Sequence, residues 1–398
     1  MRKGLLCAAG VLCGVFLATG VSAGKGGADS KARVLSPMRI AGAFALTGGG
    51  AALDREAADG AKLAVKEINA GGGVLGRTIE FIVKDTQYRA DEAARVGKQF
   101  VELERVVAGI GFADTDSVLA IGPSFQARGI PFVSVGATSP GLPQQVGDTL
   151  FLACFGDNTQ AAAGAEFVLK NFGKTAYLLW DKDMDFTVLL AGYFKTHFQS
   201  MGGSVVLEDR YDDRTTDFSG HVARIKALPE KPDFYYVSAM PYNVGEVIRQ
   251  LREAGITGPI MGGDGYDTPD LIKMAGPASD NVYFTTHALM DPEHGTVPIR
   301  NFIAAFRNEY YRSPANAFAA LGYDAMRLVA DAASRAGSAE PAAIRKALEQ
   351  TTDFPGVTGS ITFSPGSHVP RKGVTLIRVK EGRLTRAGEI VPREPPSP

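Results

Sequence analysis

Residues 133–142 read VSVGATSPGL, and they continue a buried strand, IPFVSV (130–135), into a loop of small and polar residues. The same transition, from an apolar strand into Gly, Thr, Ser or Asp, follows YLLW (177–180) and PIMGG (259–263). In open parallel sheets, ligands bind beyond the carboxyl ends of the strands, where loops and helix N-termini present N–H groups. Short side chains there let a small ligand approach the backbone, and a hydroxyl such as that of Thr138 can bond an anion.

Strands and helices alternate along the rest of the chain. Continuously apolar strands are typical of a parallel sheet that helices cover on both faces, which predicts an α/β fold. A chain of 398 residues, 45% of them hydrophobic, is too long for one ordinary core, so two such sheets are expected. The expected strands are 38–46, 78–85, 106–112, 130–135, 150–155, 176–181, 204–211, 233–239, 259–264, 282–288, 359–363 and 374–379.

The expected helices are marked by their apolar faces and by their stops. One amphipathic helix ends at the glycines 71–73, since glycine commonly terminates helices, and another covers about 91–104. Residues 298–351 have helical periodicity in three pieces, broken near Ser313-Pro314 and Gly337. No short solenoid repeat is present.

The first residues predict a secretory signal. Arg2 and Lys3 form a basic start, and residues 5–19 are apolar apart from small residues. Val21-Ser22-Ala23 has the small residues that signal peptidase requires, which predicts cleavage after Ala23. The alternative is an uncleaved anchor helix, because the apolar stretch is nearly long enough to span a bilayer. The Val-Ser-Ala sequence favours cleavage, so the mature protein is expected to be soluble and periplasmic.

The cysteines and the net charge further limit the classes of protein to which this chain could belong. Cys7 and Cys13 would leave with the signal, and neither has the leucine three residues earlier that a lipoprotein signal needs. Cys154 would then be alone, which excludes an intrachain disulfide and predicts a small core residue. The formal net charge of −1 becomes −3 without the signal, and neither value indicates a nucleic acid or an anionic membrane surface as partner.

Motifs for catalysis, metals and cofactors are missing or incomplete. GGGVLGRT (71–78) lacks the lysine of a phosphate loop and runs from a helix to a strand, the reverse of the required order. DKDMD (181–185) has the spacing of the first calcium ligands, but Phe186 stands where the loop needs glycine. The histidines, His287 among them, form no metal-binding pair and are interpreted as surface or hinge residues. With no nucleophile elbow or C-x-x-C motif, no catalytic residue, metal or cofactor is predicted.

Asp264, in GGDGYD, ends an apolar strand between glycines. Aspartate is common in turns and at helix N-termini, and taken alone this residue is interpreted in that way. The functional alternative is a carboxylate directed into a cleft.

Taken together, the stretches quoted below follow one another in the order and at the spacing of a known protein family. The mature chain, from about Met38 to Glu389, resembles the periplasmic leucine/isoleucine/valine-binding protein family, which are type I solute receptors of ABC importers. No single motif carries the resemblance; it rests on AVKEINAGGGVLGR (64–77), GIGFADTDSV (109–118), VSVGATSPGL (133–142), VIRQLREAG (247–255) and IMGGDGYDTPDL (260–271).

The resemblance implies two doubly wound parallel-sheet lobes joined by three hinge crossovers, with the ligand between them. Lobe one would comprise about 38–154 and 287–364, and lobe two about 155–286 and 365–390. The Pro-rich end, 391–398, is expected to be disordered.

The resemblance also assigns the groups that hold an amino acid. Thr115 falls on the family's first carboxylate-binding hydroxyl, and Gly136, Ala137 and Thr138 fall on its second loop. Neutral donors can hold a carboxylate without a buried cation. The acid that receives the ligand's ammonium group falls on Asp264, where family members often have the longer glutamate.

The side-chain pocket diverges from the family. The aromatic residue of lobe two falls near Phe186 and that of the following crossover loop on Met240. The aromatic residue near the first loop falls on Leu53, whereas Phe318 keeps an aromatic wall. The anchor points are therefore expected to be retained and the pocket to differ.

Two acids lie beside these positions. Asp114 and Asp185 are interpreted as solvated charges at the rim of the cleft. If they faced the cleft, they would favour a polar or cationic ligand.

The expected function is that of a periplasmic substrate-binding protein of an ABC importer, without catalysis. Its ligand would be a branched-chain or other small α-amino acid, and its partner an inner-membrane permease. The first alternative is a receptor for an amide, urea or an aromatic or other carboxylate, although such a ligand would leave Asp264 unpaired. A sensory binding module is the second alternative, and an enzyme of two Rossmann-like lobes is the third, which the missing motifs disfavour.

Overall fold

The structure is a computed structural model that describes residues 35–392, 395 and 397. The described residues from Ser36 onward form one compact unit, and the fold described below is that of this unit. The predicted signal (1–23) and half of the predicted disordered tail (391–398) lie outside the described residues. Within the described ranges, no helix combines the length and apolar character needed to cross a membrane.

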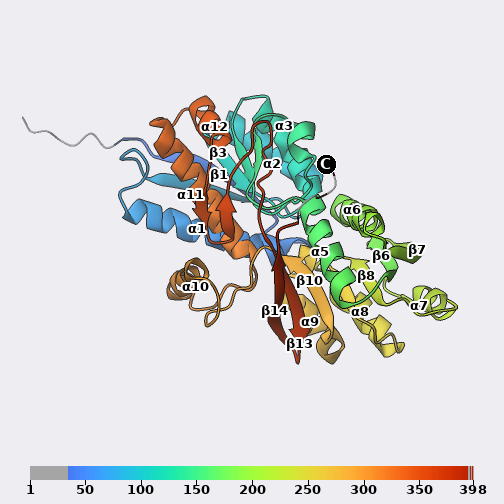
Figure 1. Ribbon diagram of the computed structural model, residues 1–398. Helices are drawn as coiled ribbons and strands as arrows, with labels where there is room; N and C mark the ends of the chain where they lie inside the picture. Colours follow the sequence, from blue (N-terminus) through green and yellow to red (C-terminus); the bar gives the residue numbers. More distant parts are fainter. Residues whose placement is uncertain (1–34, 393–394, 396, 398) are drawn as a thin grey trace, which may run out of the picture. The chain divides into compact units, whose positions relative to one another are not determined.

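The first sheet has five strands, all parallel, in the order β2-β1-β3-β4-β5 (Figure 1). Four of its strands are almost entirely buried, the edge strand β2 is partly buried, and a helix follows each of the first four strands along the chain, as the alternating pattern predicts. The elements are β1 (Met38–Phe44), α1 (Ala51–Ala70), β2 (Ile79–Asp85), α2 (Ala90–Glu102), β3 (Ala108–Gly111), α3 (Thr115–Gln126), β4 (Phe132–Ser134), α4 (Leu142–Val146) and β5 (Leu150–Leu152).

The second sheet has seven strands in the order β14-β13-β10-β9-β8-β6-β7. Its strands β6 to β10 are parallel to one another. The elements are α5 (Asp157–Asn171), β6 (Thr175–Asp181), α6 (Asp185–Ser200), β7 (Ser204–Tyr211), α7 (Ser219–Lys226), β8 (Phe234–Ser238), α8 (Val244–Glu253), β9 (Ile260–Gly262), η1 (Asp264–Tyr266), α9 (Pro269–Ala275), η2 (Gly276–Ser279) and β10 (Val282–Thr286).

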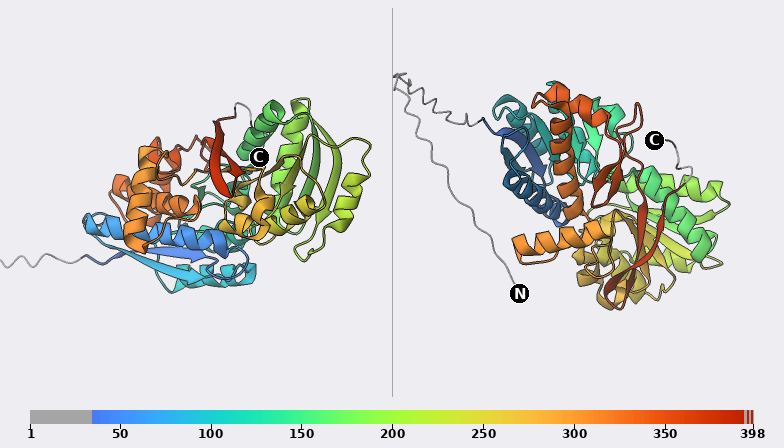
Figure 2. Two further views of the ribbon diagram at one scale, coloured as in Figure 1. Left: turned by 90° about the horizontal axis from the view of Figure 1, so that it is seen from below. Right: turned by 60° about the vertical axis from the view of Figure 1, so that its left-hand side comes forward.

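The edge of the second sheet corrects the expectation of purely parallel pairing. Strands β13 (Val374–Lys380) and β14 (Arg383–Ile390) are antiparallel to their neighbours: β13 pairs with β10, and β14 pairs with β13 as the outermost strand. Both strands are drawn in red in Figure 2. β14 was not predicted, because its sequence RLTRAGEI carries few apolar residues. An edge strand that is largely exposed needs no continuous apolar run, and its charged side chains discourage pairing with other chains.

Alternate residues of the strands in the second sheet face opposite layers of helices. On β6, Tyr177 and Leu179 pack in a core with residues of α7, α8 and α9, whereas Ala176 and Leu178 pack in a second core with residues of α5 and α6. Successive side chains of a strand point to opposite faces, so a strand covered on both faces must be apolar throughout. This explains why the stretch AYLLW (176–180) is continuously apolar.

The chain crosses between the two sheets three times: after β5, after β10 and before β13. Between the second and third crossings lie α10 (Val297–Tyr310), α11 (Phe318–Ala336), α12 (Pro341–Glu349), β11 (Phe354–Gly356) and β12 (Gly359–Ile361). The three helical pieces predicted within 298–351 are therefore confirmed. The predicted division into two lobes with three crossovers is also confirmed, and the exact residue bounds of the lobes stay a prediction.

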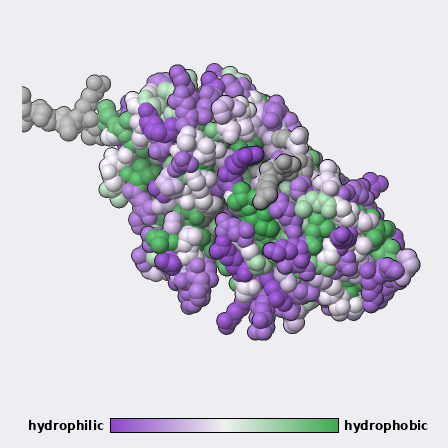
Figure 3. Space-filling view, viewed as in Figure 1, coloured by the Kyte–Doolittle hydropathy of each residue, from purple (hydrophilic) through white to green (hydrophobic). Residues whose placement is uncertain are grey.

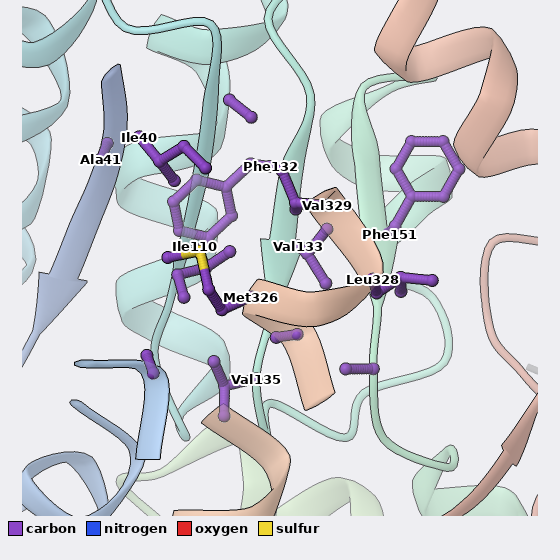
Figure 4. Packing of buried hydrophobic residues seen from close by; sticks show 14 of the residues in the cluster. Ile40, Ala41, Ile110, Phe132, Val133, Val135, Phe151, Met326, Leu328 and Val329 are labelled. Atoms are coloured by element: carbon purple, nitrogen blue, oxygen red, sulfur yellow. The ribbon is translucent and has the colours of Figure 1, made fainter. Parts of the chain in front are cut away.

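The core of the first lobe lies between the five-stranded sheet and α11. Figure 4 shows Ile110, Phe132 and Val133 from the strands facing Met326 and Val329 of α11. All five side chains are at most 1% exposed, and a side chain of this size contributes roughly 1.5–3 kcal/mol when it is fully buried. This packing fixes the strand ends, and the loops after β3 and β4 begin from a rigid support.

Candidate functional site

The predicted ligand-binding residues stand at strand ends of both lobes. Thr115 begins α3, directly after the β3 loop, and Thr138 lies in the loop after β4, the neighbouring strand. Asp264 follows β9 in the second lobe, and His287 follows β10, the neighbour of β9. All four positions lie beyond the carboxyl ends of parallel strands, where binding residues of α/β sheets gather.

The start of α3 holds a buried hydroxyl without a partner. Thr115 is 2% exposed, and its Oγ1 atom makes no hydrogen bond to any described residue. A buried hydroxyl without a partner costs free energy, and such groups in native proteins call for an explanation. A ligand acceptor would supply the missing bond.

Asp114, just before α3, corrects the prediction of a solvated rim charge. Its side chain is buried and caps α3, because its Oδ1 atom accepts a hydrogen bond from the Ser117 N–H at 2.8 Å. Burial raises the pKa of Asp114 to about 6. The N-cap position therefore determines its orientation, a helix signal that the sequence did carry. Asp185, the other predicted rim acid, is exposed as expected.

The loop after β4 is shaped by a glycine under an aromatic ring. A Cβ atom on Gly136 would lie 2.5 Å from the ring of Phe318, so only glycine leaves room for this contact. The Gly136 N–H donates to the Phe112 carbonyl at 3.0 Å, and the Ala137 N–H donates to Ser134 Oγ at 3.2 Å. Both N–H groups therefore have partners within the protein in this structure, and their predicted place in the ligand site stays a prediction.

Thr138, one of two neighbouring hydroxyl-bearing residues in this loop, links the two lobes. It is 1% exposed, and its carbonyl accepts a hydrogen bond of 2.6 Å from the N–H of Asp157, the first residue of α5. This bond ties the loop after β4 to the first crossover. Cys154, also in this crossover, is buried and unpaired with another cysteine, so its predicted role as a core residue is confirmed.

Asp264 is a buried carboxylate and does not cap a helix. It is 2% exposed; its Oδ1 atom accepts from Gln160 Nε2 at 2.9 Å, and its Oδ2 atom lies 3.0 Å from His287 Nε2. The flanking glycine at 265 is required by packing, since a Cβ there would lie 2.6 Å from the Ala239 carbonyl oxygen. The GGDGYD stretch thus places a carboxylate where bulkier neighbours could not fit.

His287 holds Asp264 from the second crossover. Its ring stacks on Phe155 with centroids 3.9 Å apart and meets Phe318 edge to face at 5.7 Å. Burial lowers the pKa of His287 below its ordinary value, which favours a neutral ring that donates its Nε2–H to Asp264. The sequence analysis grouped His287 with surface or hinge residues; the hinge position is correct, but the side chain is fully buried.

Gln160 completes this network from the first turn of α5. Its Nε2 atom donates to Asp157 Oδ1 at 2.8 Å as well as to Asp264. Its Oε1 atom accepts from the Thr285 hydroxyl at 2.7 Å and from the Asp264 N–H at 3.3 Å. All four hydrogen-bonding positions of the amide are therefore used, and the sequence analysis did not identify this residue.

The predicted pocket residues are buried in different places. Phe186 is 7% exposed and approaches Gly265, next to Asp264, and Met240 packs in the same core at 4% exposure. Phe318 adjoins Gly136 and His287, as described above. Leu53 packs in the core of the first lobe.

Two tyrosines that the sequence analysis missed lie where the lobes meet. A Cβ on Gly49 would be 3.1 Å from the rings of both Tyr88, which follows β2, and Tyr242, which follows β8. The Tyr242 hydroxyl donates to Asp181 Oδ2 at 3.2 Å, and the Tyr88 hydroxyl lies 4.0 Å from Met184 Sδ. Aromatic side chains are thus present at the boundary, although the positions carried over from the family are Met240 and Leu53.

A separate hollow of about 340 Å³ lies beside the crossovers. Its lining includes His287, but Thr115, Thr138 and Asp264 do not contribute to it. It is therefore distinct from the predicted ligand residues. Other residues that line it are Ile299, Val357, Thr358, Thr375 and Arg386.

Two lobes joined by three crossovers, with buried polar groups at facing strand ends, define a two-lobed ligand-binding protein. The sequence matches the family model described as periplasmic binding protein over residues 37–383. The chain therefore belongs to the periplasmic binding protein family. This confirms the class that the sequence predicted and places the chain among binding proteins.

Individual relatives agree with this assignment. BraC3, a Leu/Ile/Val-binding protein of Rhizobium johnstonii, is 27% identical over 349 residues, which are 86% of this chain and 91% of that protein. The leucine-binding protein LivK of Thermotoga maritima superposes with a TM-score of 0.82 at 31% identity, covering 89% of this chain and 99% of that one. LivJ of Streptococcus pneumoniae, a branched-chain amino acid transporter substrate-binding protein solved with isoleucine, gives the same TM-score and coverage at 29% identity.

Proposed function

We propose that this chain is the substrate-binding protein of an ABC importer and that it binds a branched-chain or other small α-amino acid between its lobes. The observation that carries the proposal is that the two lobes present complementary groups. One lobe has a buried carboxylate, Asp264, and the other has a buried hydroxyl, that of Thr115, without a partner among the described residues. A zwitterion presents a cation to the first and an anion to the second. The relatives named above, whose names specify leucine, isoleucine and valine, support the same class.

Each residue then has a role. The hydroxyl groups of Thr115 and Thr138 donate to the ligand carboxylate, and Asp264 accepts from its ammonium group. Gly136 sets the position of Phe318, and Phe186 and Met240 shape the space for the ligand side chain. Because the anchors are neutral hydroxyls and one acid, no cation of the protein is needed.

Transport requires a partner in the membrane. Closure of the lobes around the ligand would create the surface that docks on an inner-membrane permease. The face in Figure 3 shows its hydrophobic residues in several small patches among hydrophilic ones, so hydropathy does not single out a docking surface there. The protein would act in the periplasm, after removal of its signal at Ala23, with lobe bounds near 154, 286 and 364.

The test is calorimetric titration of the mature protein with L-leucine, L-isoleucine and L-valine. The comparison ligands are 4-methylpentanoate, which is leucine without its amine, and benzoate. We expect micromolar or tighter binding of an amino acid, weakened about a hundredfold or more by Asp264→Ala, because an uncompensated charge is left when one partner of a buried pair is removed. Asp331→Asn, which alters only a surface ion pair, is the matched control. Binding of the amine-free acids alone, or unchanged binding by Asp264→Ala, would overturn the proposal.

A further inference from the structure

Asp157 is a second buried acid beside Asp264, and nothing above gives it a role. It is 0% exposed, and its Oδ2 atom makes no hydrogen bond within the described part of the chain. Its N–H is bonded to the Thr138 carbonyl, so the residue lies against the loop proposed to hold the ligand carboxylate. A fully buried carboxyl oxygen without a partner is costly, and burial raises the pKa of Asp157 by more than the nearby Thr138 side chain lowers it, which favours a proton on this carboxyl group.

A single neutral amide joins the two acids. Gln160 Nε2 donates one hydrogen to Asp157 Oδ1 at 2.8 Å and the other to Asp264 Oδ1 at 2.9 Å. The amide orients both carboxyl groups, but it carries no charge to neutralise them. Two carboxylates buried this close repel each other, so we expect Asp157 to keep a proton in the free protein.

We propose, on the basis of the proposed function, that Asp157 is a second acidic group of the ligand site, which shares one negative charge with Asp264 in the free protein and loses its proton when an ammonium group enters. The O–H bond of Asp157 breaks, the proton passes to solvent, and the two carboxylates together face the cation. The ligand class follows from this charge balance. A zwitterionic amino acid supplies the required cation, whereas an acid without an amine would add a third negative charge.

Among the residues that the structure describes, no cation contributes to the pKa of Asp157. Lys372 Nζ is bonded to the Ala153 carbonyl at 3.0 Å and to the Thr358 hydroxyl at 2.6 Å, and burial lowers its pKa. Burial, followed by the charge of Asp264, raises the pKa of Asp157 to about 8, so this carboxyl keeps its proton at neutral pH until a cation arrives. The other titratable groups around the pair are His287, Cys154, Tyr193 and Tyr236.

The consequence is an affinity that depends on pH. Below about pH 8, binding releases close to one proton, and a process that releases one proton becomes about tenfold more favourable for each pH unit. Affinity for L-leucine should therefore rise between pH 6 and pH 8. In Asp157→Asn there is no proton to release, so the rise should be largely lost.

The experiment is calorimetric titration with L-leucine at pH 6, 7 and 8, in buffers that differ in ionisation enthalpy. At pH 7 the wild type should release close to one proton, and Asp157→Asn should release almost none. At pH 6 the affinities of the wild type and of Asp157→Asn for L-leucine should agree within about threefold. At pH 8 the wild type should bind L-leucine at least about tenfold more tightly than Asp157→Asn. Asp331→Asn should match the wild type, and thermal melts establish that each variant is folded.

Different failures have different meanings. If L-leucine binds to the wild type without proton release, the role of Asp157 is overturned while the proposed function stands. If no amino acid binds, the proposed function is overturned. Carbon-13 NMR of labelled aspartate in the free protein then tests separately whether Asp157 and Asp264 together carry one negative charge. A carboxyl signal that is absent in Asp157→Asn and titrates near pH 8 would support it, and a midpoint near pH 4 would overturn it.

Discussion

The Nε2 atom of His287 lies 3.0 Å from the Oδ2 atom of Asp264, and both side chains are shielded from solvent. The contact joins the end of β10 to the end of β9, so the residue that begins the second crossover also orients the proposed ammonium acceptor. A neutral imidazole leaves the negative charge of Asp264 available to a ligand, whereas an imidazolium would neutralise it. The low pKa of His287, caused by burial, is thus suited to binding a cation.

Replacing His287 by leucine should weaken binding of L-leucine about tenfold to a hundredfold. The variant removes a hydrogen bond to a charged acceptor, an interaction that typically contributes about 1.5–3 kcal/mol. His287→Gln keeps a donor on a side chain of similar reach and should recover part of the loss. Calorimetric titration measures both affinities.

The control for His287 is His294→Gln. His294 is also bonded to an aspartate, but its side chain is 82% exposed, and its replacement should leave binding unchanged. A purely structural role for His287 would lower the melting temperatures of His287→Leu and His287→Gln without a difference in affinity between them. That result would contradict the positioning role.

Thr115→Val should separate binding from stability. Valine has nearly the same shape as threonine but lacks the hydroxyl, which has no partner within the described residues of the free protein. Removing an unsatisfied buried polar group should leave the free energy of unfolding unchanged or raise it by about 1 kcal/mol, whereas the affinity for L-leucine should fall about tenfold. Chemical denaturation and calorimetry measure the two quantities.

Thr115→Ser is the companion variant, since it keeps the hydroxyl and loses a methyl group. It should bind L-leucine within a few fold of the wild type. Equal affinities for Thr115→Val and the wild type would show that the hydroxyl does not contact the ligand.

Gly136→Ala should destabilise the free protein by about 1–3 kcal/mol. The added Cβ would lie 2.5 Å from the Phe318 ring, and overpacking of this kind forces neighbours out of their preferred positions. Combining it with Phe318→Leu should recover part of the loss, because the smaller side chain leaves room for the methyl group. Non-additive unfolding free energies in this double-mutant cycle would verify the contact, and additive ones would refute it.

The fold could be predicted from short sequence patterns, because each pattern reflects the requirements of the helix or strand in which it occurs. The stretch AYLLW (176–180) must be apolar, since its side chains alternate between two covered faces, and the glycines after Ala70 end a helix by themselves. The polar edge strand β14 carried no such signal, because half-exposed edge strands need no apolar run.

Of the proposed site, the sequence indicated only the anchors. Thr115 and Asp264 lie in strand-end loops that the sequence marks, but the groups that orient Asp264 are a glutamine 104 residues earlier and a histidine beyond the next strand. Neither Gln160 nor His287 belongs to a local motif, because their proximity is created by the pairing of β9 with β10 and by the packing of α5. Tyr88 and Tyr242 were missed for the same reason.

The buried carboxyl group of Asp267 should make the free energy of unfolding depend on pH. Its Oδ2 atom accepts hydrogen bonds from the Thr286 hydroxyl at 2.7 Å and the Ala317 N–H at 3.1 Å, and burial raises its pKa to about 7. Between about pH 4 and pH 7 the folded state keeps this proton and the unfolded state does not. The contribution of Asp267 to stability therefore falls as pH rises, by at most about 1.4 kcal/mol for each pH unit, and is constant above pH 7.

Asp267→Asn removes this titration while keeping an oxygen acceptor for the two donors. Chemical denaturation at pH 5 and pH 7.5 should show a smaller loss of unfolding free energy in the variant than in the wild type. Asp114, with a pKa of about 6, also titrates between these pH values, and Asp157, with a pKa of about 8, titrates just above them, so the comparison depends on the difference between the two proteins. Equal losses would mean that Asp267 is already ionised in the folded state at pH 5, and that its bonds to Thr286 and Ala317 compensate for its burial.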